Sequence, residues 1–352
     1  MKPEIYKVAS YAEKQAFLNV PSVVYGKESV PSAINSFNTS MRFDPMSNPT
    51  LQHVNYANFV AIMNGKPVGR ISATIDRLNP RPSEGFWGCF ECIESTEVAR
   101  ALIDAAANWL QEQGKTEIIG PASLNTTQQV GLMIKGFEHE TREEIPYNPP
   151  YYQKIVEAAG VEKVHELDSF KWELPDDLPE RLTKKNDLPG LVVRPINYGY
   201  LIKEARIIQE VNNRAMCDIF GFIPMTLQEV QSFLLSLSTH VPPDFFLIAE
   251  VKGKPAGMMI SIPYVKPVRG KNGYIRLAIG GIVPEYRLKG IPKVIFRELY
   301  KNCRKHGFTR GEASQVASSN NDVKTKVLKP LMGTTVIKTH RVYKRTLAKA
   351  NK

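Results

Sequence analysis

The sequence repeats itself at a distance of 188 residues, and this repeat constrains the fold more than any other feature. An apolar run and a Gly-Lys-Pro-x-Gly turn occupy residues 58–69 and again 246–257. Each copy continues into a strand, a helix that ends at a glycine, and a short strand that ends in Gly-x-Ala-Ser, at 120–123 and 311–314. Four features in the same order predict two domains with one fold.

The first copy contains the local signals of a hairpin, a helix and a closing strand. Alternating apolar residues at 58–63 and 68–75 flank an Asn-Gly dipeptide, which is the strongest short hairpin signal. Apolar residues on one face predict a helix over 96–113. Further along the chain we expect a helix over 125–135 and a closing strand over 163–174.

A proline-rich, charged segment separates the two copies. Residues 175–190 read PDDLPERLTKKNDLPG, with three prolines and few large apolar side chains, which is typical of a linker. A chain of 352 residues is also too long for one ordinary hydrophobic core. We therefore predict an N-terminal domain over 1–175, a linker over 176–190 and a C-terminal domain over 191–352.

A strand, a turn and a helix in the second copy have the character of a phosphate site. Residues 273–299 contain an apolar strand closed by Pro284, a turn with Arg287, Lys289 and Gly290, and an amphipathic helix. This order aims backbone N–H groups and a helix N-terminus at one point, and glycine removes the Cβ that would keep a ligand away. The alternative interpretation is a surface turn with two solvated cations.

The first copy differs from the second at this turn. Where the second copy has residues 286–291, the first has Glu94 and Glu97, with Glu91 upstream. Carboxylates at the start of a helix repel a phosphate that the helix dipole would otherwise attract. The sequence therefore predicts nucleotide binding by the second copy alone.

The net charge of +11 is carried by the second half of the chain. Residues 1–180 contain 16 basic and 24 acidic residues, whereas residues 181–352 contain 30 and 11. Such an excess attracts polyanions: a nucleotide cofactor, RNA, an anionic membrane surface or an acidic carrier protein. The phosphates of one cofactor do not require so much charge, which leaves room for a second acidic partner.

Cysteine content and the N-terminal residues favour a cytoplasmic protein without a metal site. Cys89 and Cys92 lie three apart in a predicted strand, where they point to opposite faces and cannot easily share a metal. Charged residues such as Glu4 and Lys7 stand where a signal peptide would be apolar. No apolar run approaches the length of a membrane span.

The order of these elements resembles the GNAT acyltransferase superfamily over nearly the whole chain. Residues 287–291, RLKGI, match the R/Q-x-x-G-x-G/A phosphate-loop motif, with Pro292 in the last position. The layout of both halves, with GKPVGRISA, YNPPYY and the terminal RVYKRTL, is similar to bacterial tandem-GNAT proteins. The resemblance implies an α/β (α+β) fold of two tandem domains, each a mixed, mostly antiparallel sheet flanked by helices, the first of them degenerate.

The resemblance also implies that the second domain binds acetyl-CoA or another acyl-CoA as co-substrate. The backbone groups of Ile282 and Val283 would hydrogen-bond the pantetheine arm as an added strand. The pyrophosphate would be bound by the turn, through Arg287, Leu288, Lys289, Gly290 and Ile291. Asn320 or Asn321 matches an asparagine that family members place near the cofactor. Pro292 has no N–H, so one of the usual donors is missing.

The sequence does not identify the catalytic groups. Family members need a base for the acceptor ammonium and often a tyrosine that protonates the leaving thiolate. Leu328 or Lys329 occupies the place of that tyrosine. Other residues that could take part are Tyr274, Tyr343, Asp218 and Glu312, although a structural role explains each of them better.

Three functions agree with these features. The first is an acyl-CoA-dependent N-acyltransferase that transfers an acyl group, by family resemblance acetyl, to an amine. The second is a transferase that uses aminoacyl-tRNA, because tandem copies of this fold occur in Fem-type peptidyltransferases and the positive charge suits RNA. The third is a non-catalytic CoA-binding protein, favoured by Pro292 and the missing tyrosine. The charge excess further predicts RNA or an acidic acyl carrier protein as a macromolecular partner.

Overall fold

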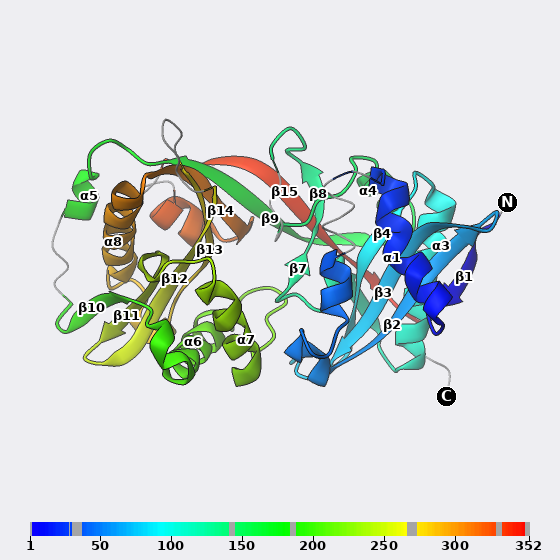
Figure 1. Ribbon diagram of the computed structural model, residues 1–352, viewed down its shortest axis with the longest axis horizontal. Helices are drawn as coiled ribbons and strands as arrows, with labels where there is room; N and C mark the ends of the chain where they lie inside the picture. The colour runs from blue at the N-terminus through cyan, green and yellow to red at the C-terminus, as the bar shows by residue number, and fades with distance from the viewer. Residues whose placement is uncertain are drawn as a thin grey trace. The chain divides into compact units, whose positions relative to one another are not determined.

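The structure is a computed structural model that divides into two compact units. It describes residues 2–27, 29, 37–140, 145–183, 188–265, 273–328 and 333–348. Unit 1 comprises Met1–Glu166, Gly221–Ile223 and Thr339–Lys352, and unit 2 comprises Leu167–Phe220 and Pro224–Lys338. Each unit contains a sheet with helices against it, labelled in Figure 1.

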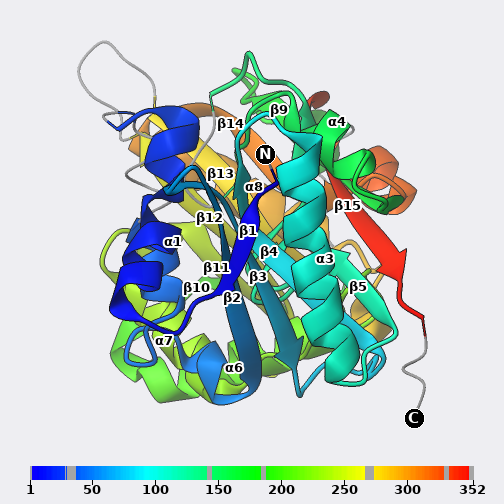
Figure 2. The same cartoon turned by 90° about the vertical axis from the view of Figure 1, so that its right-hand side faces the viewer.

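Unit 1 is built on a sheet with the strand order β1-β2-β3-β4-β5-β15. The strands are β1 (Glu4–Lys7), β2 (Val54–Met63), β3 (Lys66–Asp76), β4 (Glu84–Cys92), β5 (Glu117–Gly120) and β15 (Thr335–Thr346). All neighbours are antiparallel except β4 and β5. Helix α3 (Thr96–Glu112) runs along this sheet (Figure 2) and shares its core with Phe59 and Ala61, whereas α1 (Tyr11–Tyr25) packs on Val60. The two helices therefore cover opposite faces, because adjacent strand residues alternate.

The segment after β5 corrects one prediction. Residues 125–135, where we expected a helix, contain the short strands β7 (Gln129–Val130) and β8 (Leu132–Lys135), which follow β6 (Ala122–Ser123). Gly131 adopts φ +94°, which a helix does not allow, and β8 pairs antiparallel with β15. Helix α4 (Tyr152–Glu157) comes next.

Unit 2 repeats the arrangement with the strand order β10-β11-β12-β13-β14-β9. The strands are β10 (Leu191–Pro195), β11 (Phe246–Val251), β12 (Lys254–Val265), β13 (Gly273–Ile282), β14 (Phe308–Ala317) and β9 (Glu162–Glu173). The helices are α5 (Glu180–Thr183), α6 (Leu201–Ala215), α7 (Leu227–Ser238) and α8 (Ile291–His306). Again the neighbours are antiparallel except one pair, β13 and β14, which α8 connects.

The predicted repeat and fold class are confirmed in detail. Both hairpins turn through two residues with positive φ, Asn64-Gly65 in unit 1 and Lys252-Gly253 in unit 2. Both also shift register at the same place, between Ala61 and Ile62 and between residues 249 and 250. Each unit is thus a mixed, mostly antiparallel sheet flanked by helices, as predicted.

The last strand of each sheet comes from the other half of the chain. β9, the predicted closing strand of the first half, pairs with β14 and places Phe170 and Trp172 in the core of unit 2. The end of β15 pairs with β5 and places Tyr343 and Leu347 in the core of unit 1. The contacts therefore divide the chain at 166/167, ahead of the predicted linker. They also divide β15, because the chain as far as Lys338 belongs to unit 2 and Thr339–Lys352 belongs to unit 1.

This exchange makes the fragment boundaries testable. We expect a fragment 167–338 to fold, and a fragment 188–338 to aggregate, because the shorter one loses the buried Phe170 and Trp172 and exposes the edge of β14. Circular dichroism and size-exclusion chromatography of the two fragments provide the measurement. Equal solubility and a cooperative thermal transition in both would show that β9 is dispensable for unit 2.

Candidate functional site

The parallel strands β13 and β14 separate halfway along their length. They pair from Gly273↔Phe308 to Leu277↔Ala313, after which β14 pairs only with β9, at Val316↔Asp168 and Ala317↔Leu167. Residues 279–282 of β13 continue to pair with β12, and Ala278 lies at a shift in the register. Within the described residues, no strand pairs with their other edge. Unit 2 therefore has an open backbone edge in the middle of its sheet.

Hydrogen bonds at the end of β13 show which backbone groups face this edge. Val283 N–H donates to Ala256 O at 2.9 Å, and Val283 O accepts from Tyr286 N–H at 2.9 Å. Because backbone groups alternate along an antiparallel strand, Ile282 and Gly280 direct their N–H and C=O away from β12. Of the two residues we predicted for pantetheine, Ile282 faces the open edge, where its C=O accepts from Arg287 Nε at 3.3 Å. Both backbone groups of Val283 are satisfied internally.

The open edge leads into the predicted phosphate turn. A 3₁₀ turn at Pro284–Tyr286 is followed by Leu288 with φ +62° and Gly290 with φ +78°, and α8 begins at Ile291. The N–H groups of Leu288, Gly290 and Ile291 donate to no described residue, and Leu288 is 90% exposed. Pro292 occupies the first turn of α8, where it removes one donor without breaking the helix. The turn thus presents unpaired donors at a helix N-terminus, the arrangement that binds anions.

The two cations of the turn have different surroundings. Arg287 donates to Asp218 Oδ2 at 3.1 Å and to Ala215 O at 3.1 Å, so it fastens the turn to the end of α6. Lys289 Nζ lies 5.4 Å from the centre of the Tyr286 ring. Arg287 therefore acts as a brace in this structure, and the backbone and Lys289 supply the positive field.

The predicted asparagines lie beyond β14. Asn320 Oδ1 accepts from Val323 N–H at 3.1 Å and caps the helical turn Val323–Leu328, while Asn321 is exposed. Asn320 Oδ1 is thus used within its own turn, and a position near the cofactor stays a prediction for both asparagines.

In unit 1 the equivalent edge of β4 is covered by side chains. β4 and β5 pair only from Glu84 to Phe86. Beyond that point Cys92 N–H donates to Tyr152 Oη at 2.8 Å, and Cys92 O accepts from Tyr151 Oη at 2.8 Å. Cys89 N–H donates to Ser123 Oγ at 3.3 Å. These bonds use the backbone groups that an added strand would need.

The same side chains surround a buried carboxylate. Glu91 accepts from Tyr152 Oη at 2.7 Å and from Tyr25 Oη at 2.8 Å, and the Arg70 guanidinium lies 3.9 Å away. Burial raises the pKa of Glu91, although Arg70 and the two hydroxyls oppose the rise. The region of unit 1 that corresponds to the open edge is therefore filled and acidic.

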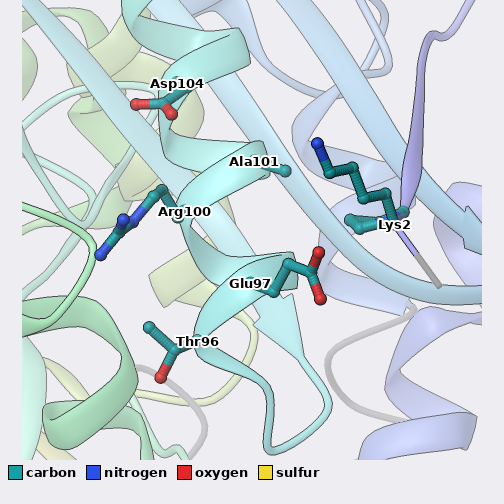
Figure 3. A pocket seen from close by; sticks show the side chains of 7 residues that line it. Lys2, Thr96, Glu97, Arg100, Ala101 and Asp104 are labelled. Atoms are coloured by element: carbon teal, nitrogen blue, oxygen red, sulfur yellow. The ribbon is translucent and has the colours of Figure 1, made fainter.

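Helix α3, the counterpart of α8, carries Glu97 in its first turn. A hollow beside its first turns is lined by Lys2, Thr96, Glu97, Arg100 and Asp104 (Figure 3). Ser95 caps the helix by accepting from Val98 N–H at 3.3 Å, so one N-terminal donor is already used. These features agree with the predicted lack of a phosphate site in unit 1.

The structure brings two of the four catalytic candidates together. Tyr274 Oη donates to Glu312 Oε2 at 3.1 Å, next to Lys338. Asp218 does not join Tyr274 and Glu312, because it pairs with Arg287. Tyr343 donates to Glu157 at 2.9 Å in unit 1, and burial raises its pKa. Sequence reasoning missed Lys338 as a partner of Glu312, because β15 brings it from the far end of the chain.

Eight basic residues along α8 and β15, which carry part of the charge excess, are paired. The pairs are Arg297 with Leu182 O, Lys301 with Glu298, Arg304 with Asp176, Lys305 with Asp244, Lys338 with Glu312, Arg341 with Glu166, Lys344 with Glu117, and Arg345 with Asp104. A cation that is already paired attracts a polyanion less strongly than an unpaired one. Binding of RNA or of an acyl carrier protein stays a prediction.

The hydrogen bonds that side chains of unit 1 make to the edge of β4 can be tested by measuring the free energy of unfolding. We expect Tyr152→Phe to lower the free energy of unfolding by about 1–3 kcal/mol, because the buried Cys92 N–H and Glu91 each lose a partner. Tyr151→Phe is the matched control, with a smaller loss, because that ring is only half-buried. Urea denaturation compares the two, and equal losses would contradict the assigned role of Tyr152.

No helix in the described part of the chain is long and apolar enough to cross a membrane.

Comparisons with known proteins support the same fold. No family model matches the chain. The bacterial ceramide synthase of Caulobacter vibrioides is 29% identical over 270 residues, which are 74% of this chain and 70% of that protein. Protein YghO of Escherichia coli is 28% identical over 314 residues, 82% of this chain and 77% of that protein.

Among solved structures, a tandem GNAT protein from the clavulanic acid biosynthesis pathway matches with a TM-score of 0.57 and 13% identity. The match covers 99% of this chain and 100% of that one. The chain is therefore a tandem-domain protein with two copies of the GNAT fold.

Proposed function

We propose that the protein is an acyl-CoA-dependent N-acyltransferase whose CoA site lies in unit 2. The observation that carries the proposal is the continuity of the open β13 edge with the anion-binding turn. Residues 278–282 provide about 16 Å of edge at roughly 3.3 Å per residue. This edge suits an extended pantetheine arm, and the turn at the start of α8 suits a pyrophosphate.

Each part of CoA has a counterpart among the residues of unit 2. The arm would pair with the outward N–H of Ile282 and with the outward N–H and C=O of Gly280, as a peptide adds to a sheet edge. The pyrophosphate would accept hydrogen bonds from the N–H groups of Leu288, Gly290 and Ile291, with Lys289 nearby. Within this proposal Gly280 replaces Val283, and Arg287 holds the turn in place. CoA supplies the thioester, and the chain supplies binding and orientation.

The name of one relative favours a long acyl chain. A ceramide is a long-chain amino alcohol acylated at its nitrogen, so a ceramide synthase forms an amide of the kind that the GNAT resemblance predicts. We therefore propose a fatty acyl-CoA as donor and a long-chain amine as acceptor, with acetyl-CoA as the alternative donor that the family resemblance suggested.

One set of measurements tests the proposal. Calorimetry with CoA, acetyl-CoA, palmitoyl-CoA and tRNA is expected to show binding of the CoA compounds only. Palmitoyl-CoA with sphinganine or spermidine is then expected to yield the N-acyl product, detected by mass spectrometry. Binding of tRNA alone would favour the aminoacyl-tRNA alternative, and CoA binding without any amide would favour a non-catalytic protein.

The turn itself can be tested by one substitution. Gly290→Glu is expected to weaken CoA binding at least a hundredfold, because it fills the turn and places a carboxylate beside the pyrophosphate. Calorimetry with CoA measures the effect.

Gly253→Glu is the matched control for this variant. Gly253 has φ +75° in an exposed hairpin of the same unit, and no atom lies within 4 Å of the position that a Cβ would take there. Its backbone strain on substitution is therefore similar to that of Gly290. The control should keep wild-type affinity. If both variants bind CoA equally, the pyrophosphate does not lie at this turn.

A further inference from the structure

A cluster of largely buried polar side chains lies where β13 and β14 separate. We call it the apex cluster, and its members are Tyr274, Arg276, Glu312, Ser314 and Lys338. The Glu312 carboxylate accepts from Ser314 Oγ at 2.8 Å, from Lys338 Nζ at 3.1 Å and from Tyr274 Oη at 3.1 Å. Arg276 Nε donates to Ser314 Oγ at 2.9 Å. A continuous hydrogen-bond network thus joins both separating strands.

The cluster stands at the inner end of the open edge. Leu277 and Ala313 form the last pair between the strands, and Tyr274 and Arg276 precede that pair on β13. Ile275 and Leu277 belong to the apolar core, so Tyr274 and Arg276 project from the other face. If CoA lies as proposed above, its arm runs from α8 towards Ala278 and delivers the thioester to this cluster.

The fold itself does not require these charges. Unit 1 has Phe86 and Gly88 at the repeat positions of Tyr274 and Arg276, and Pro121 at that of Glu312. Its strands β4 and β5 nevertheless form the same parallel pair and separate in the same way. A buried ion pair is also a weak source of stability, because desolvation offsets most of the attraction. The apex cluster is therefore better explained by chemistry than by folding.

Glu312 is held in its ionised form. Burial by itself raises the pKa of Glu312, but Lys338, the hydrogen bonds from Ser314 and Lys338, and Arg276 outweigh it and hold the pKa below its usual range. On β9, Lys171 stands opposite Glu312 in register but pairs with Glu173 at 2.7 Å. Glu312 and Lys338 are both fully buried, whereas Tyr274 is partly exposed and touches the carboxylate.

From this geometry we propose that Tyr274 is a catalytic residue that passes a proton from the acceptor ammonium to Glu312, with Lys338 as a positioning residue. The inference rests on the proposed function, since it assumes an acyl-CoA and an amine. Tyr274 accepts one ammonium proton while its own hydroxyl proton moves to Glu312.

The remaining steps conserve atoms and charge. The neutral amine attacks the thioester carbon, the C–N bond forms, and the C–S bond breaks. The second nitrogen proton goes to the thiolate and gives CoA-SH. Glu312 then returns its proton to solvent through Tyr274. The overall reaction converts the ammonium and the thioester into an amide, CoA-SH and one released proton.

Tyr274→Phe tests the proposal with the least disturbance, because it removes only the hydroxyl. With palmitoyl-CoA and sphinganine, we expect kcat to fall by about 10²–10⁴-fold, the range for loss of a general acid–base group. Calorimetric affinity for CoA should stay within threefold of wild type. A kcat within threefold of wild type, with CoA bound normally, would overturn the role of Tyr274.

Variants of the ion pair test the positioning role. Lys338→Met should raise the pKa of Glu312 and move the acidic limb of the kcat/KM profile to higher pH, with Lys171→Met as the matched control that leaves the profile unchanged. An unmoved limb in a folded Lys338→Met variant would overturn the role of Lys338.

If the single variant unfolds, Glu312→Gln with Lys338→Met removes both charges together. The double variant should fold and bind CoA but lose turnover, and turnover at the wild-type rate would overturn the proposal.

Thermal unfolding provides a test that does not depend on enzymatic activity. Because the folded pKa of Glu312 lies below its usual value, its stabilisation is present at neutral pH and is lost as the pH falls through the folded pKa. The double variant should therefore show a weaker loss of Tm on acidification than wild type. An equal loss would show that Glu312 is not held ionised.

The two proposals fail in different ways. A wild-type protein that binds no CoA, or binds it and forms no amide, would overturn the proposed function and this inference with it. A wild-type protein that forms the amide, together with a Tyr274→Phe variant that keeps its rate, would overturn this inference alone.

Discussion

The loss of one of the two partners of β14 is the constraint on which the rest of unit 2 depends. β14 pairs with both β13 and β9 as far as Ala313, and then with β9 alone at Val316 and Ala317. A strand that stayed on β13 would satisfy residues 278–282 and leave no open edge. Since backbone N–H and C=O groups need partners, the open edge suits the extended ligand that we propose for it. β9 makes this possible, because it holds β14 on its other side.

The two units show how one architecture can be open or closed to a ligand. Both contain a parallel pair that separates, and in both a helix starts close to the end of the first strand. In unit 1, Tyr151, Tyr152 and Ser123 bond the free backbone groups of β4, and Tyr152 also bonds the buried Glu91 carboxyl. In unit 2, Arg287 Nε donates to Ile282 O at 3.3 Å, whereas Gly280 has no side-chain hydrogen bond among the described residues. The side chains at this edge therefore distinguish the two copies, and they are the reason that we propose the nucleotide site for unit 2 alone.

Local signals in the sequence predicted much of the fold. The Asn64-Gly65 turn and the amphipathic pattern of α3 depend on residues that are close together in the sequence. The 188-residue repeat is found by comparing the sequence with itself. The structure confirms all three. The exchange of β9 and β15 was missed, because pairing with a distant strand leaves no mark in the strand's own pattern. The error at 125–135 has the same origin, since β8 takes its hydrogen bonds from a strand some 200 residues away.

At the candidate site the sequence located the turn, but it did not show in which direction the backbone groups of β13 point. Whether Val283 or Gly280 faces the edge depends on the register with β12, which Val283 N–H fixes by bonding Ala256 O. The apex cluster needed more information still, because Lys338 reaches Glu312 from a strand at the far end of the chain. Desolvation makes such a pair costly unless each charge has its partners. Its position beside the open edge of β13 is the reason that we connect this cost with the proposed chemistry of the thioester.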